Sequence, residues 1–230
     1  YWNEYHQKRI MNLQIITIDG PSGVGKGTLA LSLANYLSLN YLNSGSIYRA
    51  VAYLSELENI NTDNIKEIIS LTSTLNIRFI TDNKEFKIIC NDQDITEEIN
   101  NEECATRASI ISSNIDVRKS LIDIQRSFCK EPGLIAEGRD MGSVIFRNSQ
   151  KKIFLTASNE IKAQRRHKQL KQKGINVSLP HLIEELDNRD SRDVSRKISP
   201  LVIPSDAYII DTDKLTINEV FDKTLKYINN

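Results

Sequence analysis

The run DGPSGVGKGT (Asp19–Thr28) contains residues whose types and spacing suit the binding of phosphate groups. Gly20, Gly23 and Gly25 let the backbone curl so that several N–H groups point into one concavity. A helix opening at Lys26 would add its positive N-terminal end, and the ammonium group adds a full charge. The pattern G-x-x-x-x-G-K is that of a phosphate-binding P-loop, and with Gly-Thr after it arises by chance in roughly a few chains per ten thousand of this length. We therefore expect this chain to bind a nucleoside triphosphate.

Two further polar clusters follow predicted strands. They are NSGSIYR (Asn43–Arg49) and EGRD (Glu137–Asp140). Because ligands gather at the carboxyl ends of the strands in open α/β sheets, both clusters should meet the P-loop at one rim. Taken singly, Ser44 reads equally well as a helix cap, Arg49 as a solvated charge and Asp140 as a cap for the next turn. Their joint position beside a P-loop favours a binding site.

A fourth cluster, RDSRDVSR (Arg189–Arg196), is rich in guanidinium groups. On a helix, four of its side chains share one face: Arg189, Arg192, Asp193 and Arg196. Like charges at this spacing are mildly destabilising unless an anion joins them. A solvated helix with internal Asp–Arg pairs remains an alternative. In a nucleotide-binding chain we favour a phosphate clamp, because the guanidinium fork fits phosphoryl oxygens, and Arg165 and Arg166 could add to it.

The distribution of arginines indicates a second phosphate-bearing substrate. Phosphoryl transfer needs positioning and charge neutralisation more than covalent chemistry. Arginines occur at four separated places: Arg49, Arg139, Arg165–Arg166 and Arg189–Arg196. This pattern favours a kinase acting on a small molecule that is already phosphorylated.

Two other function classes stay open at this point. A P-loop nucleotide switch or regulatory ATP-binding protein would need a carboxylate at the end of an apolar strand, whereas the third strand runs into Glu137-Gly-Arg. No Asn/Thr-Lys-x-Asp guanine-specificity motif is present. A kinase for another small acceptor, such as shikimate or UMP, is the third possibility.

The elements that must position these residues alternate between strand and helix. Five apolar runs, at 13–19, 41–43, 134–136, 152–156 and 207–211, predict buried parallel strands. Helical periodicity follows the P-loop, begins again near Ser46, and recurs from Ser158 to about 173 and around 182–196. Thr216 and Glu219 form a capping box that opens a final helix. The sequence therefore predicts a doubly wound α/β sheet.

The alternation of single strands and helices is interrupted between about residues 62 and 130. A periodic helix (65–75) precedes three short β-like runs, at 77–80, 85–90 and 93–96, and two helical stretches (101–112 and 115–129) follow. Closely spaced short strands favour antiparallel pairing. We expect a small inserted subdomain here.

Composition excludes several classes of partner. The 230 residues carry 30 basic and 30 acidic side chains, so no global field attracts nucleic acid or an anionic membrane. No apolar run approaches the ~20 residues of a membrane span. The three cysteines are far apart and read as free thiols in a reducing compartment. We expect a cytoplasmic monomer.

Residues 1–10 are polar and aromatic without the apolar region of a signal peptide. We expect them to be an extension in front of a single domain at 11–230. Met11 is an alternative start.

The four motifs together resemble those of bacterial cytidylate kinases, within the nucleoside monophosphate kinases. The resemblance runs from about Ile15 to the C-terminus and rests on the P-loop, NSGSIYR, GRDMG (Gly138–Gly142) and the Arg189–Arg196 cluster. It implies a P-loop kinase fold with an NMP-binding insert and a short lid at about 160–196. It also implies transfer of the γ-phosphoryl of ATP, with Mg²⁺, to CMP or dCMP. In this family a glycine between Lys26 and Thr28 is usual.

The resemblance also assigns roles to individual residues. The ATP phosphates would lie against Gly20, Pro21, Ser22, Gly23, Val24, Gly25, Lys26, Gly27 and Thr28. The cytosine would contact Ser44, Ser109, Arg118 and Asp140, with Tyr48 packed near the base. Arg49, Arg139 and Arg196 would hold the CMP phosphate, and Arg189 and Asp193 would reach the ribose. Catalytic charge would come from Lys26, Arg165, Arg166 and Arg192, and no metal-binding side chain is assigned.

The chain departs from the family pattern at two places. Asn43 and Glu137 stand where Asp is usual or frequent. Neither change removes a proposed ligand group.

Overall fold

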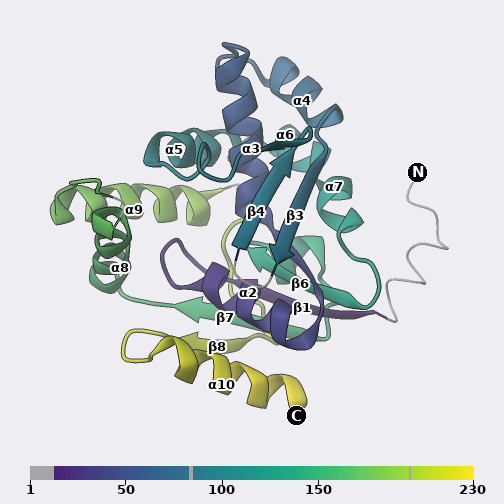
Figure 1. Ribbon diagram of the computed structural model, residues 1–230, viewed down its shortest axis with the longest axis vertical. Coiled ribbons are helices and arrows are strands. Elements are labelled where there is room, and N and C mark those ends of the chain that lie inside the picture. Colours follow the sequence, from purple (N-terminus) through teal and green to yellow (C-terminus); the bar gives the residue numbers. More distant parts are fainter. Residues whose placement is uncertain (1–12, 83–84, 173, 197) are drawn as a thin grey trace.

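A five-stranded parallel sheet forms the centre of the computed structural model, which describes residues 13–82, 85–172, 174–196 and 198–230 (Figure 1). Within these residues the strand order is β2-β6-β1-β7-β8. The strands are β1 (Gln14–Asp19), β2 (Asn40–Asn43), β6 (Gly133–Gly138), β7 (Lys151–Thr156) and β8 (Tyr208–Asp211). All five predicted parallel strands are therefore confirmed. The predicted extension at residues 1–10 lies outside the described residues.

Helices cover both faces of this sheet, as a doubly wound fold requires. Ile16 and Ile18 of β1 pack with α2 (Lys26–Leu37) and α10 (Ile217–Asn229) on one face. Ile15 belongs to the cluster on the other face, with α3 (Ser44–Leu57). Successive residues of a strand point to opposite faces, so a strand buried on both sides is apolar throughout.

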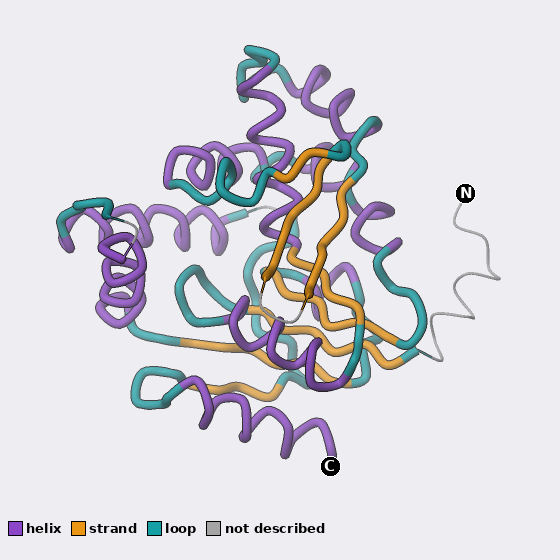
Figure 2. Tube along the Cα trace, in the orientation of Figure 1, coloured by secondary structure: helices purple, strands orange, loops and turns teal. Residues whose placement is uncertain are grey.

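The predicted insert separates α3 from β6. It contains α4 (Ile65–Ser73), β3 (Ile77–Asp82), β4 (Glu85–Cys90), β5 (Gln93–Asp94), α5 (Glu102–Ile111), α6 (Ile115–Ser120) and α7 (Ile122–Ser127). Strands β3, β4 and β5 pair antiparallel, as predicted, and lie above α2 in Figure 2. Here "the insert" denotes residues 62–130.

Element ends inside the insert differ from the prediction by up to two residues, and one predicted helix is divided. Two of these differences have a structural cause. Strand β5 stops before Thr96, because the Thr96 side chain itself accepts the backbone N–H of Ile88 at 2.8 Å and replaces the next ladder bond. The stretch predicted as one helix over 115–129 is two helices. The N–H of Leu121 donates to the carbonyl of Arg118 at 3.2 Å, a three-residue turn that breaks the α-helical pattern.

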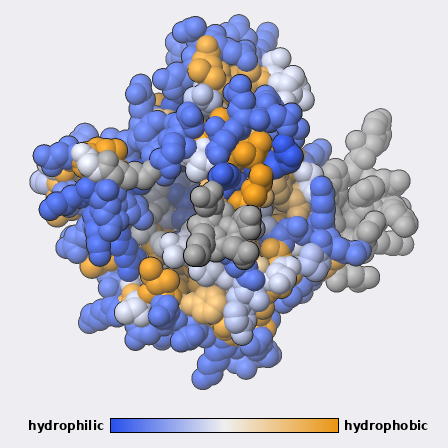
Figure 3. Space-filling model, viewed as in Figure 1, coloured by the Kyte–Doolittle hydropathy of each residue, from blue (hydrophilic) through white to orange (hydrophobic). Residues whose placement is uncertain are grey.

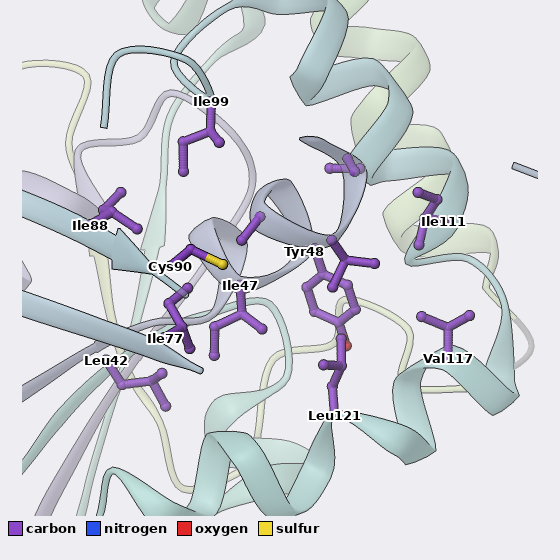
Figure 4. Packing of buried hydrophobic residues seen from close by; sticks show 14 of the residues in the cluster. Leu42, Ile47, Tyr48, Ile77, Ile88, Cys90, Ile99, Ile111, Val117 and Leu121 are labelled. Carbon is purple, nitrogen blue, oxygen red and sulfur yellow. The ribbon is translucent and has the colours of Figure 1, made fainter. Parts of the chain in front are cut away.

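The insert is fastened to the parallel sheet by apolar contacts. Phe79 and Phe86 lie against the ring of Tyr41 on β2, with ring centroids 5.8 and 5.3 Å away. At its other end, Tyr48 of α3 packs among Ile111, Val117 and Leu121 (Figure 4). The insert therefore shares one hydrophobic core with the sheet.

Helices α8 (Asn159–Gln172) and α9 (Leu179–Ser195) form an arm, residues 159–195, at one side of the molecule (Figure 1). They pack on each other through a small cluster of their own: Ala163, Leu170, Leu182 and Leu186. Hydrophilic residues predominate over the arm in Figure 3. None of the helices in the described part of the chain is long and apolar enough to span a membrane.

The expectation that Arg196 shares a helical face with Arg189 is wrong. Helix α9 ends at Ser195, and the backbone of Arg196 is extended (φ −57°, ψ 134°). Its side chain nevertheless returns to Asp193 in an ion pair.

Candidate active site

The P-loop lies between β1 and α2, as predicted. Gly25 precedes α2 with φ 94°, a left-handed conformation that favours glycine. A Cβ at Gly20 would collide with the carbonyl oxygen of Leu155. The loop therefore needs glycine at both positions, and the first residues of α2 (Lys26, Gly27 and Thr28) line the cavity above the loop.

Lys26 and Glu137 are buried beside each other under this loop. Burial lowers the pKa of Lys26 well below its usual value, and the charge of Arg139 lowers it further, although Glu137 opposes the shift. Nζ of Lys26 donates to the carbonyl oxygen of Pro21 at 2.6 Å. A buried cation with a depressed pKa gains from the arrival of an anion. Lys26 is thus arranged to receive negative charge.

Gly27 has a structural reason to be glycine. A Cβ added there would lie 3.2 Å from Oε1 of Glu137, closer than ordinary van der Waals contact. The same Oε1 accepts the hydroxyl of Tyr41 at 2.5 Å. The missing side chain lets the carboxylate of Glu137 approach the start of α2.

A large cavity of about 700 Å³ opens over the P-loop. Its walls include Ser22, Gly23, Val24, Gly25, Lys26, Gly27 and Thr28 from the loop, and Arg165 and Arg166 from α8. Arg165 is fixed by the loop after β8, because its guanidinium donates to the side chain and the carbonyl of Thr212 at 2.9 and 2.6 Å. This cavity has the size of a site for a small organic ligand.

A second, smaller cavity of about 90 Å³ lies between the sheet, the insert and the arm. All ten residues predicted to bind the second substrate line it: Ser44, Tyr48, Arg49, Ser109, Arg118, Arg139, Asp140, Arg189, Asp193 and Arg196. They come from α3, α5, α6, the end of β6 and α9 with its C-cap. Residues from across the chain thus converge as the sequence indicated.

One end of the small cavity is an ion pair between Arg118 and Asp140, both almost fully buried. Burial acts to lower the pKa of Arg118, but Tyr48 and Asp140 together raise it above its usual value. The guanidinium lies over the ring of Tyr48, 5.4 Å from its centroid. Ser44 donates to Oε1 of Gln125 at 2.7 Å. This end of the cavity therefore offers a ligand hydrogen-bond donors and an acceptor that are shielded from water.

Several buried donors in the small cavity lack a hydrogen-bond partner among the described residues. They include the hydroxyl of Ser109, Nε of Arg118 and Nε of Arg196. Buried polar groups in folded proteins nearly always have a partner, so unpaired ones call for a ligand or ordered water. Burial also lowers the pKa of Arg196 to about 10, with Arg118 and Arg139 adding to the effect. A bound anion would give the unpaired donors a partner and would stabilise the charged form of Arg196.

Arg139 connects the small cavity to the P-loop. Its Nη2 donates to the hydroxyl of Ser22 at 2.6 Å and its Nε to Oδ2 of Asp193 at 2.7 Å. The strand end that carries it is held by Asp19, whose two carboxylate oxygens accept the N–H groups of Met141 and Gly142 at 2.9 and 2.8 Å. These residues begin a π-helix, η1 (Met141–Ile145), which the sequence did not indicate.

The two cavities adjoin each other. Six residues line both: Ser22, Gly45, Arg49, Gly138, Arg139 and Arg189. Three of the six are arginines, so the boundary between the cavities is strongly cationic. A group passing from one cavity to the other would move between guanidinium ions.

Not every predicted residue joins these cavities. Gly20 and Pro21 shape the loop, but they are not among the residues that line either cavity, and Arg192 is not among them either. Nε of Arg192 donates to the carbonyl of Asn188, one turn back on its own helix, at 3.0 Å. In this structure Arg192 therefore lies on the same helix as Arg189 but does not join the other arginines at either cavity.

Sequence reasoning missed several residues of the site. The arm helix also carries Asp190, whose Oδ1 accepts the N–H of Ser22 in the P-loop at 3.1 Å and whose Oδ2 pairs with Lys162. Glu102 of α5 pairs with Arg166 and Arg189. In the sequence, Asp190 is only an acidic residue among arginines, and Glu102 is only an acidic residue at the start of a helix. The partners of both residues are distant in sequence, so neither contact could be predicted.

Comparison with known proteins identifies the family. The family model described as "Cytidylate kinase" matches residues 16–230. A cytidylate kinase of Shewanella putrefaciens is 42% identical over 217 residues, which cover 94% of this chain and 94% of that protein. One of Methylococcus capsulatus is 43% identical over 216 residues, covering 94% and 97%.

The chain belongs to the cytidylate kinase family. It is therefore a kinase, an enzyme that transfers phosphate. The family resemblance predicted from the four motifs is confirmed, as is the α/β fold with a small antiparallel sheet. Among solved structures, an uncharacterised protein from Eubacterium ventriosum aligns with a TM-score of 0.52 at 16% identity, covering 95% of this chain and 99% of that one. At that identity the likeness concerns the fold alone.

Proposed function

We propose that this enzyme transfers the γ-phosphoryl group of ATP to CMP and dCMP, giving ADP and CDP or dCDP. The observation that carries the proposal is the pair of adjoining cavities, one over a P-loop and one over Arg118 and Asp140, with three arginines lining both. A phosphoryl donor and a phosphorylated acceptor placed in them would meet at that boundary. Membership of the cytidylate kinase family supports the choice of acceptor.

In this proposal ATP occupies the larger cavity. The N–H groups of the loop and the ammonium of Lys26 bind its phosphates, and Arg165 and Arg166 approach from α8. The phosphoryl group has three charged oxygens in transfer, and guanidinium groups are suited to bind them. Arg192 acts as a further catalytic cation after a movement of the arm that frees its side chain, which in this structure bonds to its own helix.

CMP occupies the smaller cavity. The carboxylate of Asp140 accepts from the exocyclic amine of cytosine, while Arg118 and Ser109 donate to the ring carbonyl and nitrogen. Arg49, Arg139 and Arg196 hold the phosphate, and Asp193 with Arg189 reaches the ribose. The orphaned donors of Ser109, Arg118 and Arg196 support a polar ligand at these positions.

The residues around the P-loop suit Mg²⁺ as a partner of ATP. Thr28 and Glu137 line the larger cavity with oxygen groups, and the Glu137 carboxylate comes close to Gly27. No group of three or more His, Cys, Asp or Glu side chains within the described ranges could hold a metal ion alone. Mg²⁺ usually binds through one or two protein oxygens and substrate phosphates, so this donor set fits. When bound, the ion would neutralise charge on the β- and γ-phosphates.

We further propose that the arm is the mobile part of a monomeric enzyme. The insert corresponds to an NMP-binding subdomain and residues 160–196 to a lid. A nucleotide needs several hundred Å³, whereas the small cavity offers about 90 Å³. Admission of CMP therefore requires the walls contributed by the insert and the arm to separate.

A coupled assay tests the activity. ADP release is measured with ATP and Mg²⁺ against CMP, dCMP, UMP and AMP in turn. We expect CMP and dCMP to give the highest kcat/KM, because only cytosine presents an amine to Asp140 beside a carbonyl that Arg118 can reach. A higher kcat/KM for AMP or UMP would refute the assignment of the acceptor.

A further inference from the structure

Glu102 joins the insert to both helices of the arm. It occupies the first turn of α5, and its Oε1 accepts Nε of Arg166 on α8 at 2.5 Å. Its Oε2 accepts Nη1 of Arg189 on α9 at 3.3 Å. One carboxylate thus binds two guanidinium groups that come from different helices.

The surroundings of Glu102 are cationic and partly desolvated. Its side chain is 22% exposed, and those of Arg166 and Arg189 are 19% and 15% exposed. Burial lowers the pKa of Arg49 to about 10, with Arg189 and Arg166 adding to the shift and Glu102 opposing it. The carboxylate therefore pairs with two guanidinium groups, and its charge also offsets part of the repulsion that they exert on Arg49.

Glu102 reaches these arginines without entering the site. Arg49 and Arg189 line both cavities and Arg166 lines the larger one, but Glu102 is among the lining residues of neither. An arginine has five N–H donors in a rigid fork, so it can bind a carboxylate on one edge and a phosphate on another. Glu102 contacts Nε and Nη2 of Arg166 and Nη1 of Arg189, so both arginines keep further N–H groups for a phosphate.

Helix α5 carries a second group of residues toward the acceptor. Ala105, Ala108 and Ser109, one to two turns after Glu102, line the smaller cavity. A ligand that fixes α5 through Ser109 also fixes the carboxylate that holds the arginines of the arm. The same helix therefore touches the acceptor at one end and the phosphate-binding groups at the other.

We propose that Glu102 is a positioning residue for the phosphoryl-transfer step, an inference that rests on the proposed function. It holds Arg166 and Arg189 in place at the junction of the cavities before the phosphates arrive. Long side chains that are already ordered lose less entropy when the transferring group binds. It also couples occupation of the acceptor cavity to the placement of the arm.

The test compares Glu102→Gln with Glu103→Gln. Glu103 is the next residue in the same helical turn and is exposed, so both changes remove one negative charge from the start of α5. Single-turnover phosphorylation is measured with enzyme in excess over ATP at saturating CMP. We expect Glu102→Gln to lower this rate by about 10- to 100-fold while the KM values for CMP and ATP stay within about threefold. Glu103→Gln should leave the rate within about twofold.

Two further variants separate positioning from folding. In an Arg166→Ala background, Glu102→Gln should lower the single-turnover rate by a clearly smaller factor than in the wild type, because part of its effect acts through Arg166. Glu102→Asp keeps the negative charge on a side chain that is shorter by one methylene group. Its rate should lie between those of the wild type and Glu102→Gln. If Glu102→Gln fails to fold, Glu102→Asp still decides the matter, since a wild-type rate would overturn the proposal.

Two other results would also overturn the proposal: equal rates for the two glutamine variants, or fully additive losses with Arg166→Ala. A wild-type enzyme that does not phosphorylate CMP would instead refute the proposed function.

Discussion

The small cavity is lined by several buried ion pairs. Arg118 and Asp140 pair directly at one end, and Arg139, Asp193 and Arg196 pair at the other. Removing one partner of a buried pair leaves an uncompensated charge, which costs about 3–5 kcal/mol. Substitutions here therefore affect folding as well as binding, and conservative variants are needed to separate the two.

Asp140→Asn is expected to weaken CMP binding far more than ATP binding. The amide keeps an oxygen for Arg118 and nearly the same shape, but it removes the charge that strengthens acceptance from the cytosine amine. Hydrogen bonds to charged groups contribute about 1.5–3 kcal/mol, so the KM for CMP should rise by roughly 10- to 100-fold. The KM for ATP should stay within about threefold. Steady-state kinetics with each substrate varied in turn measures both values.

Asp116→Asn is the matched control for this prediction. Asp116 lies on α6 near Arg118, but its side chain is 59% exposed and contacts only Lys119, at 3.6 Å, among the ion pairs of the described residues. This control should leave both KM values unchanged, since exposed pairs contribute little. Equal losses of CMP and ATP binding in Asp140→Asn would contradict a base-reading role.

Individual residues were predictable where the signal was local. The P-loop, Asp140 and the arginines followed from short motifs, and Ser109 and Arg118 from the family resemblance alone. Glu102, Asp190 and Gln125 were not indicated, because their partners lie 28 or more residues away. The position of Arg196 was misjudged because a helix end depends on a cap that the charge pattern does not reveal.

At the scale of elements, the arm is attached to the rest of the enzyme mainly by polar contacts. Its apolar cluster is separate from the two clusters that flank the sheet. Asp190 bonds to the P-loop, Asp193 to Arg139, and Arg166 and Arg189 to Glu102. Contacts of this kind break and re-form more readily than a packed core, so regions with few buried apolar contacts open first.

We expect amide hydrogen exchange to report this difference. Without ligand, amides of α8 and α9 should exchange faster than those of β1 and β6, which lie in the buried sheet. CMP together with a non-hydrolysable ATP analogue should slow exchange in α5, α8 and α9, because the phosphates bridge the arginines of the arm to the P-loop. Mass spectrometry of peptic peptides provides the measurement.

The C-terminal part of α10, residues 221–229, is the internal reference, because none of these residues lines either cavity and their exchange should not respond to the ligands. AMP in place of CMP serves as the ligand control. Arm peptides that are as protected as β1 without ligand, and unchanged with both ligands, would contradict a mobile arm.

Strands and helices with strong periodicity were predicted well, and their ends were not. The apolar runs that became β1, β6 and β7 are buried on both faces, which leaves little freedom in their assignment. The π-helix η1 has no periodic signal, since it is held from outside by the carboxylate of Asp19. The break at Leu121 likewise has no periodic signal, since Leu121 is buried in the core like the apolar residues of the helices beside it.

For the whole molecule, the site and the stability of the fold draw on the same buried charges. Asp19 ends β1 within the central sheet and fixes the start of η1, so it contributes to folding and to the placement of Arg139. Burial raises the pKa of Asp19 to about 6, although its hydrogen bonds from Gly142 and Met141 act to lower it. The folded protein therefore binds this proton more tightly than the unfolded chain, where Asp has a pKa of ~3.9.

This shift predicts how stability depends on pH. The contribution of Asp19 is fully present below pH ~3.9 and is lost as the pH rises through about 6, because folding then requires a buried negative charge. From pH 5 to pH 7 it should lower the free energy of unfolding by about 1 kcal/mol. Asp19→Asn cannot ionise, so the variant should be less stable overall but should lack this decrease. Urea unfolding followed by circular dichroism at the two pH values gives the comparison.

The deciding quantity is the change in unfolding free energy between pH 5 and pH 7, taken for each protein and then compared. Glu137, whose pKa is also raised by burial, contributes to the wild type and to the variant alike and largely cancels. Asp222→Asn, an exposed change on α10, controls for the loss of a surface carboxylate and should retain the wild-type decrease. If Asp19→Asn retained it too, the raised pKa would be wrong. If only Asp19→Asn abolished it, the folded enzyme would be more stable in mild acid than at neutral pH because Asp19 is protonated there and no negative charge has to be buried.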